Sequence, residues 1–128
     1  MVLTIRDEST GAPASTARLL TLNTAKLTAR ELIRERVLHE VRQYNDSPTE
    51  RFIGLVQLSD AELALNGEKP VKRLLDADRQ VATAFETFRK HGFVLLVDGT
   101  QVESLDRELE LAPDSQITFL RLFPLAGG

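Results

Sequence analysis

The chain has 128 residues, of which 42% are hydrophobic, and this composition allows one domain to bury its own core without a metal or a disulfide. It contains no cysteine, which excludes disulfides, thiolate metal sites and a cysteine nucleophile. A net charge of −3 disfavours binding to nucleic-acid phosphates. Because no apolar run has the length of a signal peptide or a membrane span, we expect a cytoplasmic protein with no membrane partner.

The chain opens with two segments in which apolar and polar residues alternate, at residues 2–6 and 17–23. Residues 7–15 between them are rich in Ser, Thr, Gly and Pro, which are typical of turns. The pattern predicts a β-hairpin with a long, polar turn.

A helix is predicted to follow this hairpin. Thr28 and Glu31 have the spacing of a capping box, in which each side chain accepts a hydrogen bond from the backbone amide of the other residue. Apolar residues then recur every three or four positions and form one stripe facing a core: Ile33, Val37, Val41 and Tyr44. The Asn-Asp-Ser-Pro sequence at residues 45–48 is expected to end the helix.

The middle of the chain is less regular. Residues 52–58 are apolar enough for a short strand or a buried turn, and residues 59–67 favour a brief helix. Pro70 suits the first turn of a second long helix, which is expected to end at His91-Gly92. The residues expected on one face of that helix are Val71, Leu74, Leu75, Val81, Ala82, Phe85 and Phe88.

A second hairpin and a final strand are predicted in the C-terminal third. Residues 93–97 form a continuous apolar run, Asp98-Gly99 is a strong hairpin signal, and residues 100–102 continue as the partner strand. After a charged connector, residues 117–123 have the composition of a strand. This last segment is apolar on both faces, so one face is expected to meet a helix.

The order of hairpin, helix, hairpin and last strand, followed by Gly127-Gly128, resembles ubiquitin and the other β-grasp modifiers. The resemblance covers roughly residues 1–44 and 93–128. The ending Phe-Pro-Leu-Ala-Gly-Gly is also similar to that of the sulfur carriers of molybdopterin and thiamine synthesis. Residues 45–92 are too long for either group, and the chain therefore resembles best the bacterial ubiquitin-like proteins that are encoded beside their own activating and conjugating enzymes.

The resemblance implies an α+β fold, a ubiquitin-like β-grasp with an inserted helical segment between the first helix and the second hairpin. The expected organisation is one domain over residues 1–128. Its core comprises about residues 1–44 and 93–123, its insertion about residues 45–92, and its C-terminal tail residues 124–128.

The resemblance also implies that chemistry occurs at Gly127 and Gly128. In such modifiers an activating enzyme uses ATP to adenylate the C-terminal carboxylate, and an enzyme cysteine attacks the mixed anhydride to form a thioester. Glycines fit the narrow channel of such an enzyme because they have no Cβ. The chain supplies the electrophile, and the cysteine belongs to its partner.

Three functions are compatible with this tail. The first is a protein modifier that a conjugating enzyme transfers to a target amine, forming an isopeptide bond. The second is a sulfur carrier with a C-terminal thiocarboxylate, and the third is a non-covalent β-grasp adaptor whose tail is incidental. We expect the modifier, because a sulfur carrier gains little from a second long helix, and the resemblance then implies a conjugation operon of bacterial antiviral defence.

The activating enzyme is expected to dock near the end of the last strand. The proposed partner-binding residues are Leu120, Leu122, Phe123, Pro124 and Leu125. Pro124 also has a simpler role, because it lacks a backbone donor and ends the strand. In the alternative interpretation, the inserted helix covers the face that carries Leu120 and Leu122.

Other polar patterns do not indicate a catalytic or metal site. His39 and His91 are the only histidines, and the sequence contains no phosphate-binding loop, zinc motif or Ser-His-Asp order. Arginines and glutamates alternate at helical spacing along the first helix, which predicts a salt-bridged surface: Arg30, Arg34, Arg36, Arg42, Glu31, Glu35 and Glu40. We therefore expect no cofactor and no catalysis by this chain.

Overall fold

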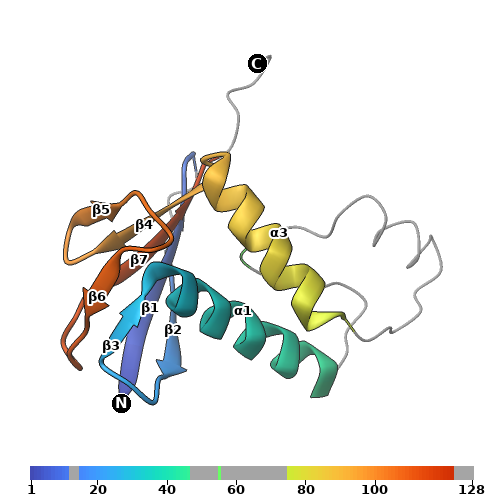
Figure 1. Cartoon of the computed structure of the whole chain (residues 1–128), viewed down its shortest axis with the longest axis horizontal. Helices are drawn as coiled ribbons and strands as arrows, with labels where there is room; N and C mark the ends of the chain where they lie inside the picture. The colour runs from blue at the N-terminus through green and yellow to red at the C-terminus, as the bar shows by residue number, and fades with distance from the viewer. Residues whose placement is uncertain (12–14, 47–54, 56–74, 123–128) are drawn as a thin grey trace.

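The structure, a computed structural model, describes residues 1–11, 15–46, 55 and 75–122. Within these residues the fold is mixed α+β, with two helices and a five-stranded sheet that contains both parallel and antiparallel pairs. Figure 1 shows the sheet on one side of the molecule and both helices on the other. This arrangement is compatible with the β-grasp expected from the sequence.

The five-stranded sheet has the order β2-β1-β7-β4-β5. β1 and β7 are parallel neighbours inside the sheet, and the other neighbouring pairs are antiparallel. A separate two-stranded sheet pairs β3 with β6. The strands are β1 (Val2–Ser9), β2 (Thr16–Thr21), β3 (Lys26–Thr28), β4 (Phe93–Val97), β5 (Thr100–Val102), β6 (Glu108–Glu110) and β7 (Ile117–Arg121).

The first hairpin is confirmed, but its first strand is longer than the sequence predicts. β1 and β2 pair as far as Asp7 and Thr16. β1 then continues to Ser9, because its other edge pairs with β7 up to Arg121. The prediction of a turn beginning at Asp7 is therefore wrong, and Asp7 is a buried strand residue.

α1 (Ala29–Asp46) begins at the predicted capping box. The Glu31 amide donates to the Thr28 hydroxyl at 3.2 Å, and this hydroxyl donates to the Glu31 carboxylate at 3.2 Å. The predicted stripe faces the core: Ile33, Val37 and Val41 are buried and Tyr44 is half-buried. The helix extends to Asp46, within the segment that was predicted to end it.

α3 (Ala77–Arg89) begins later than the sequence predicts, so the prediction of one uninterrupted helix from Pro70 is wrong. Asp76 is the N-cap, and its side chain accepts a hydrogen bond from the amide of the third helical residue at 3.2 Å. Leu75 is held outside the helix, because Asn45 accepts from its amide at 2.8 Å and donates to its carbonyl at 3.2 Å.

The buried face of α3 differs from the predicted one. Its buried residues are Gln80, Val81, Ala84 and Phe88. Val81 and Phe88 confirm the prediction, Phe85 is half-buried, and Ala82 is exposed. Ala82 faces away because it is two positions from both Gln80 and Ala84, whereas residues three or four apart share a helix face.

The second hairpin is confirmed. Val97 pairs with Thr100, so the loop has two residues, and both have positive φ, 49° at Asp98 and 82° at Gly99. Positive φ at both positions is the signature of the type I′ turn, whose twist matches that of the paired strands. β7 ends at Arg121, two residues before the end that the sequence predicts, so Leu122 follows the strand.

Several predictions concern residues that the structure does not describe. These are the short helix at residues 59–67, most of the strand or turn at residues 52–58, and the helix residues Pro70, Val71 and Leu74. Leu55 is described, and it is buried, with 4% of its surface exposed.

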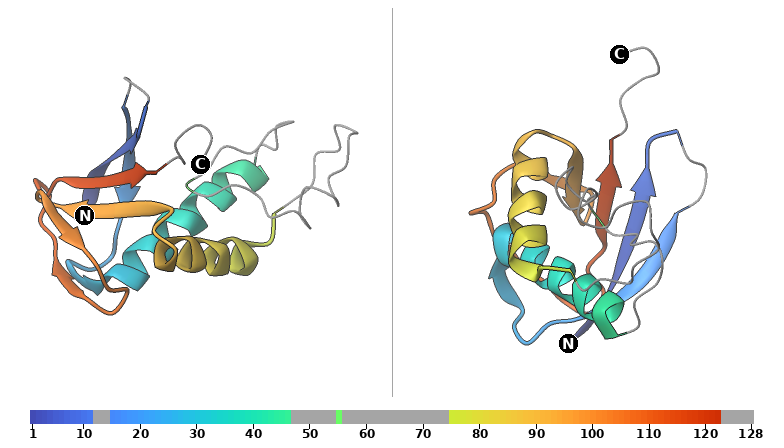
Figure 2. Two further views of the ribbon diagram at one scale, coloured as in Figure 1. Left: turned by 90° about the horizontal axis from the view of Figure 1, so that it is seen from above. Right: turned by 90° about the vertical axis from the view of Figure 1, so that its right-hand side faces the viewer.

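The two helices pack on one face of the sheet. α3 lies beside α1, and Figure 2 shows both helices in front of the strands when the molecule is viewed from its helical side. Strand residues on this face are fully buried, including Leu3, Ile5, Leu95 and Phe119. Because side chains alternate along a strand, the intervening residues point to the opposite face of the sheet.

Candidate functional site

The end of β7 is fixed to the turn between α3 and β4. The Leu122 amide donates to the Gly92 carbonyl at 3.0 Å. Gly92 is itself tightly packed, since a Cβ at this position would lie 2.4 Å from Cγ2 of Thr87. The predicted residues after this point lie outside the described structure: Phe123, Pro124, Leu125, Gly127 and Gly128.

Leu120 and Leu122 are both half-buried. Leu120 pairs with Val94 across the β4 and β7 strands, and both residues alternate with buried core residues, so they face away from the helices. Leu96 of β4 shares this outer face. α3, the described helix of the insertion, lies on the other face, so it does not cover Leu120.

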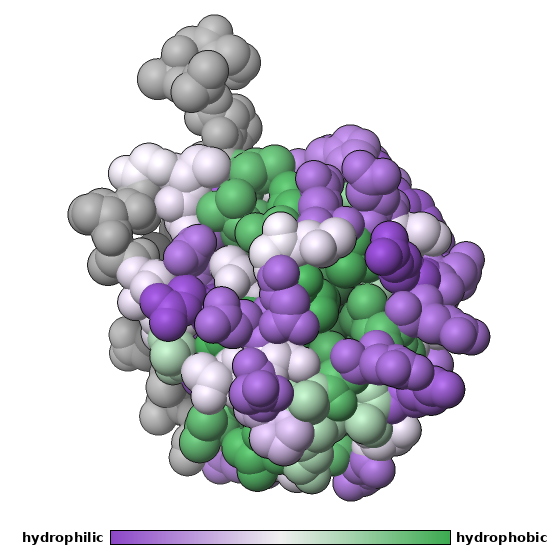
Figure 3. Space-filling model, turned by 90° about the vertical axis from the view of Figure 1, so that its left-hand side faces the viewer, coloured by the Kyte–Doolittle hydropathy of each residue, from purple (hydrophilic) through white to green (hydrophobic). Residues whose placement is uncertain are grey.

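Figure 3 views the molecule from the side of the sheet and shows apolar side chains gathered in a band with polar residues on both flanks. Leu19 on β2 and Val2 on β1 are the most exposed large apolar residues of the described chain, at 62% and 52%. Both lie at outward positions of their strands, opposite to Leu3 and Leu20. The outer face therefore carries exposed or half-buried apolar side chains on β1, β2, β4 and β7.

A second surface feature is an open cleft of about 440 Å³ between α3, the start of α1 and the segment that joins β5 to β6. Phe88 and Leu105 supply buried apolar surface to it, with 8% and 6% exposed. Its polar lining is made of Arg30, Arg89, His91, Glu103, Ser104 and Asp106.

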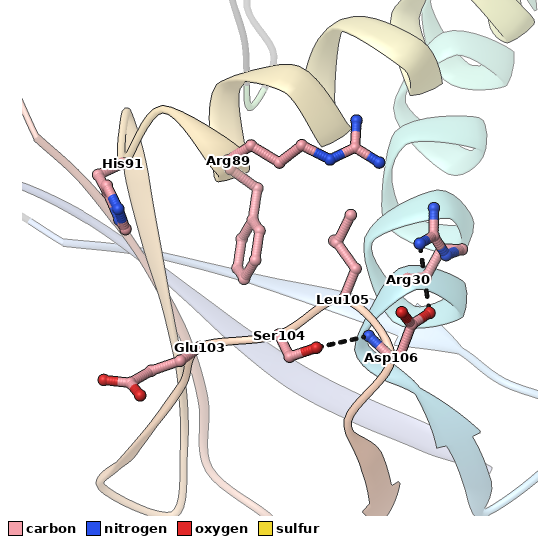
Figure 4. Close-up of a pocket in the computed structure, with 8 residues that line it drawn as sticks. Arg30, Arg89, His91, Glu103, Ser104, Leu105 and Asp106 are labelled. Atoms are coloured by element: carbon pink, nitrogen blue, oxygen red, sulfur yellow. Dashed lines mark hydrogen bonds and ion pairs between the residues drawn. The ribbon is translucent and has the colours of Figure 1, made fainter.

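The walls of this cleft are held by local hydrogen bonds. Arg30 of α1 pairs with Asp106 at 3.2 Å, and the Ser104 hydroxyl accepts from the Asp106 amide at 3.2 Å. Figure 4 shows Arg89 extending from α3 towards α1, and the carboxylate of Glu103 pointing away from both arginines. Of the two acidic residues in the lining, Asp106 is therefore paired with Arg30, and Glu103 faces away from both arginines.

A third feature is a cluster of charged side chains inside the protein, which we call the buried charge cluster: Asp7, Arg18, Arg36 and Glu40. Arg36 is 2% exposed and donates to both oxygens of Asp7, one of them at 2.7 Å, and to Glu40 at 2.6 Å. Arg18 approaches the same two carboxylates at 3.3 and 3.4 Å. Two acidic and two basic groups thus balance in charge.

The buried charge cluster also joins distant segments. Glu40 accepts a hydrogen bond from the Leu55 amide at 2.9 Å, and the Arg36 guanidinium lies 4.5 Å from the ring centroid of Phe119 on β7. The prediction that Arg36 and Glu40 belong to a salt-bridged surface is therefore wrong. They lie inward because they occupy the same helix face as Ile33, Val37 and Val41.

The two histidines lie in different surroundings. His91 is exposed, has a φ of 60°, and follows the C-cap of α3, whereas His39 is half-buried on α1. In the described part of the chain, no group of three or more His, Asp or Glu side chains is arranged to hold a metal ion. None of the helices in the described ranges is long and apolar enough to cross a membrane.

Comparison of the chain with protein-family models, curated proteins and solved structures gave no match. Its function must therefore be inferred from its own residues and their arrangement. The apolar residues around Leu120 in the sequence predict the apolar outer face of the sheet. The sequence-based predictions included neither the cleft nor the buried charge cluster. A helical-wheel reading of positions 33, 36, 37, 40 and 41 was the signal available for the cluster.

Proposed function

We propose that this chain is a ubiquitin-like protein modifier whose C-terminal glycine is activated by adenylation and transferred to a target amine through an enzyme thioester. The proposal needs the α-carboxylate of Gly128 to be free. The observation that carries it is the strand order, in which β7 is paired on both edges and is the last strand before Gly127-Gly128 in the sequence.

The arrangement of elements supports a β-grasp assignment for residues 1–46 and 93–122. The first hairpin is followed by α1, the second hairpin by the final strand, and β1 and β7 are parallel. α1 crosses the face of the sheet that holds the core, as expected for this class of fold. The described residues of the insertion add α3 beside α1, and they contribute no strand to the five-stranded sheet.

The residues of the chain suit a passive role in this chemistry. A carboxylate becomes reactive when ATP converts it into a mixed anhydride with AMP, and a cysteine thiolate then displaces AMP to form a thioester. The chain contains no cysteine, so that thiolate belongs to a partner enzyme. Two terminal glycines place no Cβ near the reacting carbonyl.

The outer face of the sheet is the proposed docking surface for the activating enzyme. Leu120 and Leu122 lie at the point where the chain leaves β7, so a protein bound there is close to the residues that follow. The six residues that follow Leu122 span at most about 22 Å when extended. Docking near the end of β7 therefore keeps Gly128 within reach of the active site.

A thioester assay tests the proposal. The full chain is incubated with its cognate activating enzyme and with ATP, and the products are resolved with and without thiol reductant. We expect a reductant-sensitive adduct that disappears when Gly127 and Gly128 are deleted. A deletion variant that still forms the adduct, or a full chain that never does, would contradict the proposal.

The Pro-Leu-Ala-Gly-Gly ending supports a second candidate, a sulfur carrier. Activation is the same, but a sulfur donor replaces the target amine and leaves a thiocarboxylate at Gly128. Intact mass of the chain purified from its own host distinguishes the two. Replacement of one oxygen by sulfur would identify a carrier, whereas an unmodified carboxylate together with isopeptide-linked adducts would identify a modifier.

A further inference from the structure

We propose that the cleft lined by Arg30, Arg89 and Leu105 binds an extended peptide segment of a partner protein, in which an acidic side chain stands next to an apolar one. The cleft is lined by residues of α1, of the end of α3 and of the segment between β5 and β6, whereas Leu120 lies on the outer face of the sheet. The inference goes beyond the proposed function, because it requires neither the tail nor an activating enzyme.

The apolar part of the peptide is assigned to the surface made by Phe88 and Leu105. Both side chains reach the cleft although they are more than nine-tenths buried, so they are supported by the core beneath them. The ring centroids of Phe88 and Phe93 lie 5.8 Å apart and those of Phe93 and Phe119 lie 6.0 Å apart, with the rings tilted against each other in both pairs. This aromatic row makes the apolar surface rigid, and a rigid surface binds with a smaller loss of side-chain entropy.

The acidic part of the peptide is assigned to the two arginines. Figure 4 shows Arg89 extending across the cleft towards the α1 side, where Arg30 lies. A guanidinium presents several donors in one plane and suits a carboxylate better than a lysine does. Glu103 points away from this side, so its carboxylate does not oppose an incoming anion there.

The present partners of both arginines are weak enough for a ligand to replace or join them. Arg89 lies 3.9 Å from the Glu86 carboxylate, and both side chains are 55% exposed. Lys90 approaches the same carboxylate at 3.4 Å. Arg30 pairs with Asp106, whose side chain is 80% exposed. Exposed pairs of this kind contribute little to stability, because water screens them.

The size and shape of the cleft also fit a short peptide segment. A volume of about 440 Å³ falls within the range of about 300–1,000 Å³ that is typical of ligand sites, but this cleft is open to solvent. Small-molecule sites bury most of their ligand, whereas an open cleft leaves both ends of a chain free to continue. We therefore favour a segment within a longer protein over a free metabolite.

The experiment is a titration of the isotope-labelled full chain, followed by the shifts of its backbone amide resonances. The probe is a blocked tetrapeptide with the central pair Asp-Leu, and two matched peptides carry Asn-Leu and Asp-Ser. We expect the Asp-Leu peptide to shift the amides of Phe88, Arg89, His91 and Leu105. It should bind about tenfold more tightly than Asn-Leu at low salt, because a charge-assisted hydrogen bond is lost in the latter.

Two protein variants complete the test. Arg89→Gln should weaken binding of the Asp-Leu peptide about as much as the Asn substitution does, and Arg79→Gln, an exposed arginine of the same helix outside the cleft, should leave binding unchanged. Equal losses in both variants would show unspecific attraction and overturn the proposal. Equal affinity for all three peptides, or shifts centred on Val94 and Leu120, would overturn it as well.

Removal of residues 123–128 tests whether a partner peptide or the chain's own tail occupies the cleft. If the partner proposal is correct, this truncation leaves the amides of Arg89 and Leu105 unshifted and the peptide affinity unchanged. If the truncation shifts these amides and increases the peptide affinity, the tail occupies the cleft and the proposal fails. Self-association of the full chain that Arg89→Gln abolishes would assign the cleft to a second copy and would also overturn it.

Discussion

Two arginines on the same helix, Arg36 and Arg30, form ion pairs in opposite surroundings. Arg36 is 2% exposed and joins two buried carboxylates, whereas Arg30 pairs with an 80% exposed Asp106. The sequence offers the same residue types in both places, but only one pair lies in a region from which water is excluded. Breaking a buried pair leaves an uncompensated charge inside the protein, whereas an exposed pair is largely replaced by water.

The largest expected effect is that of Arg36→Met. This change leaves Asp7 and Glu40 buried with Arg18 as their remaining cation, and it should lower the free energy of unfolding by about 3–5 kcal/mol. Urea denaturation of the full chain measures the loss. A loss below about 1 kcal/mol would contradict the assignment of Arg36 to a buried position.

The matched control replaces three of the four charges of the cluster together, as Asp7→Leu, Arg36→Met and Glu40→Met. Only Arg18 then remains, and because its side chain is 29% exposed it can reach water, so this variant should be more stable than Arg36→Met alone. Part of the loss is expected to remain, because Glu40 also accepts the Leu55 amide. A triple variant that is less stable than the single one would mean that the charges contribute a net attraction.

The next effect concerns the turn that holds the end of β7. Gly92→Ala places a Cβ 2.4 Å from Cγ2 of Thr87 and should cost about 1–3 kcal/mol of stability through overpacking. Thr87→Ser removes that methyl group, so the double variant should recover part of the loss. Thermal unfolding of the two single variants and the double variant gives a double-mutant cycle. If the stability changes of the two single variants simply add in the double variant, the proposed clash is contradicted.

A smaller effect is expected at the start of α3. Asp76→Ala removes the acceptor for the Arg79 amide and should cost about 1 kcal/mol. Asp76→Asn keeps a capping oxygen, so its denaturant midpoint should remain close to that of the unchanged chain. If the two substitutions cost the same, Asp76 would not act as a cap, and the helix would have to begin before Ala77.

The smallest effect sharpens the comparison between the two arginines. Arg30→Gln should change the free energy of unfolding by less than about 1 kcal/mol, although it also removes a guanidinium 5.3 Å from the ring centroid of Phe85. Added salt should reduce this difference further. A loss comparable with that of Arg36→Met would show that exposure does not decide the strength of these pairs.

Much of the fold was predictable because it depends on local patterns. The alternation in residues 2–6 and the Asp98-Gly99 turn each have one physical interpretation, and the structure confirms both. The capping box is confirmed in its Thr28 half, whereas the Glu31 carboxylate accepts from the Thr28 hydroxyl. The start of α3 was not predictable from helical periodicity, because apolar residues before Asp76 continue the same spacing. The cap, rather than the periodicity, determines where that helix begins.

The candidate sites also divide into those that local sequence patterns predict and those that only the fold brings together. Leu120 was identified because a strand with two apolar faces has one face left over once the core is filled. The cleft was not identified, because it combines residue 30, residues 88–91 and residues 103–106, which only the folded chain brings together. The sequence composition predicts a turn that begins at Asp7 and a salt-bridged surface for Arg36 and Glu40, although their positions in the alternation and on the helix stripe point inward.

The parallel pairing of β1 and β7 has a mechanical consequence. β1 starts at Val2 and β7 ends at Arg121, so tension applied between the beginning of β1 and the end of β7 acts along both strands in opposite directions. Their hydrogen bonds are then loaded in shear and must break together rather than one after another. β7 is also bonded to β4 on its other edge, and Leu122 to Gly92, so a load pulling at the end of β7 is shared by two neighbouring strands and a turn.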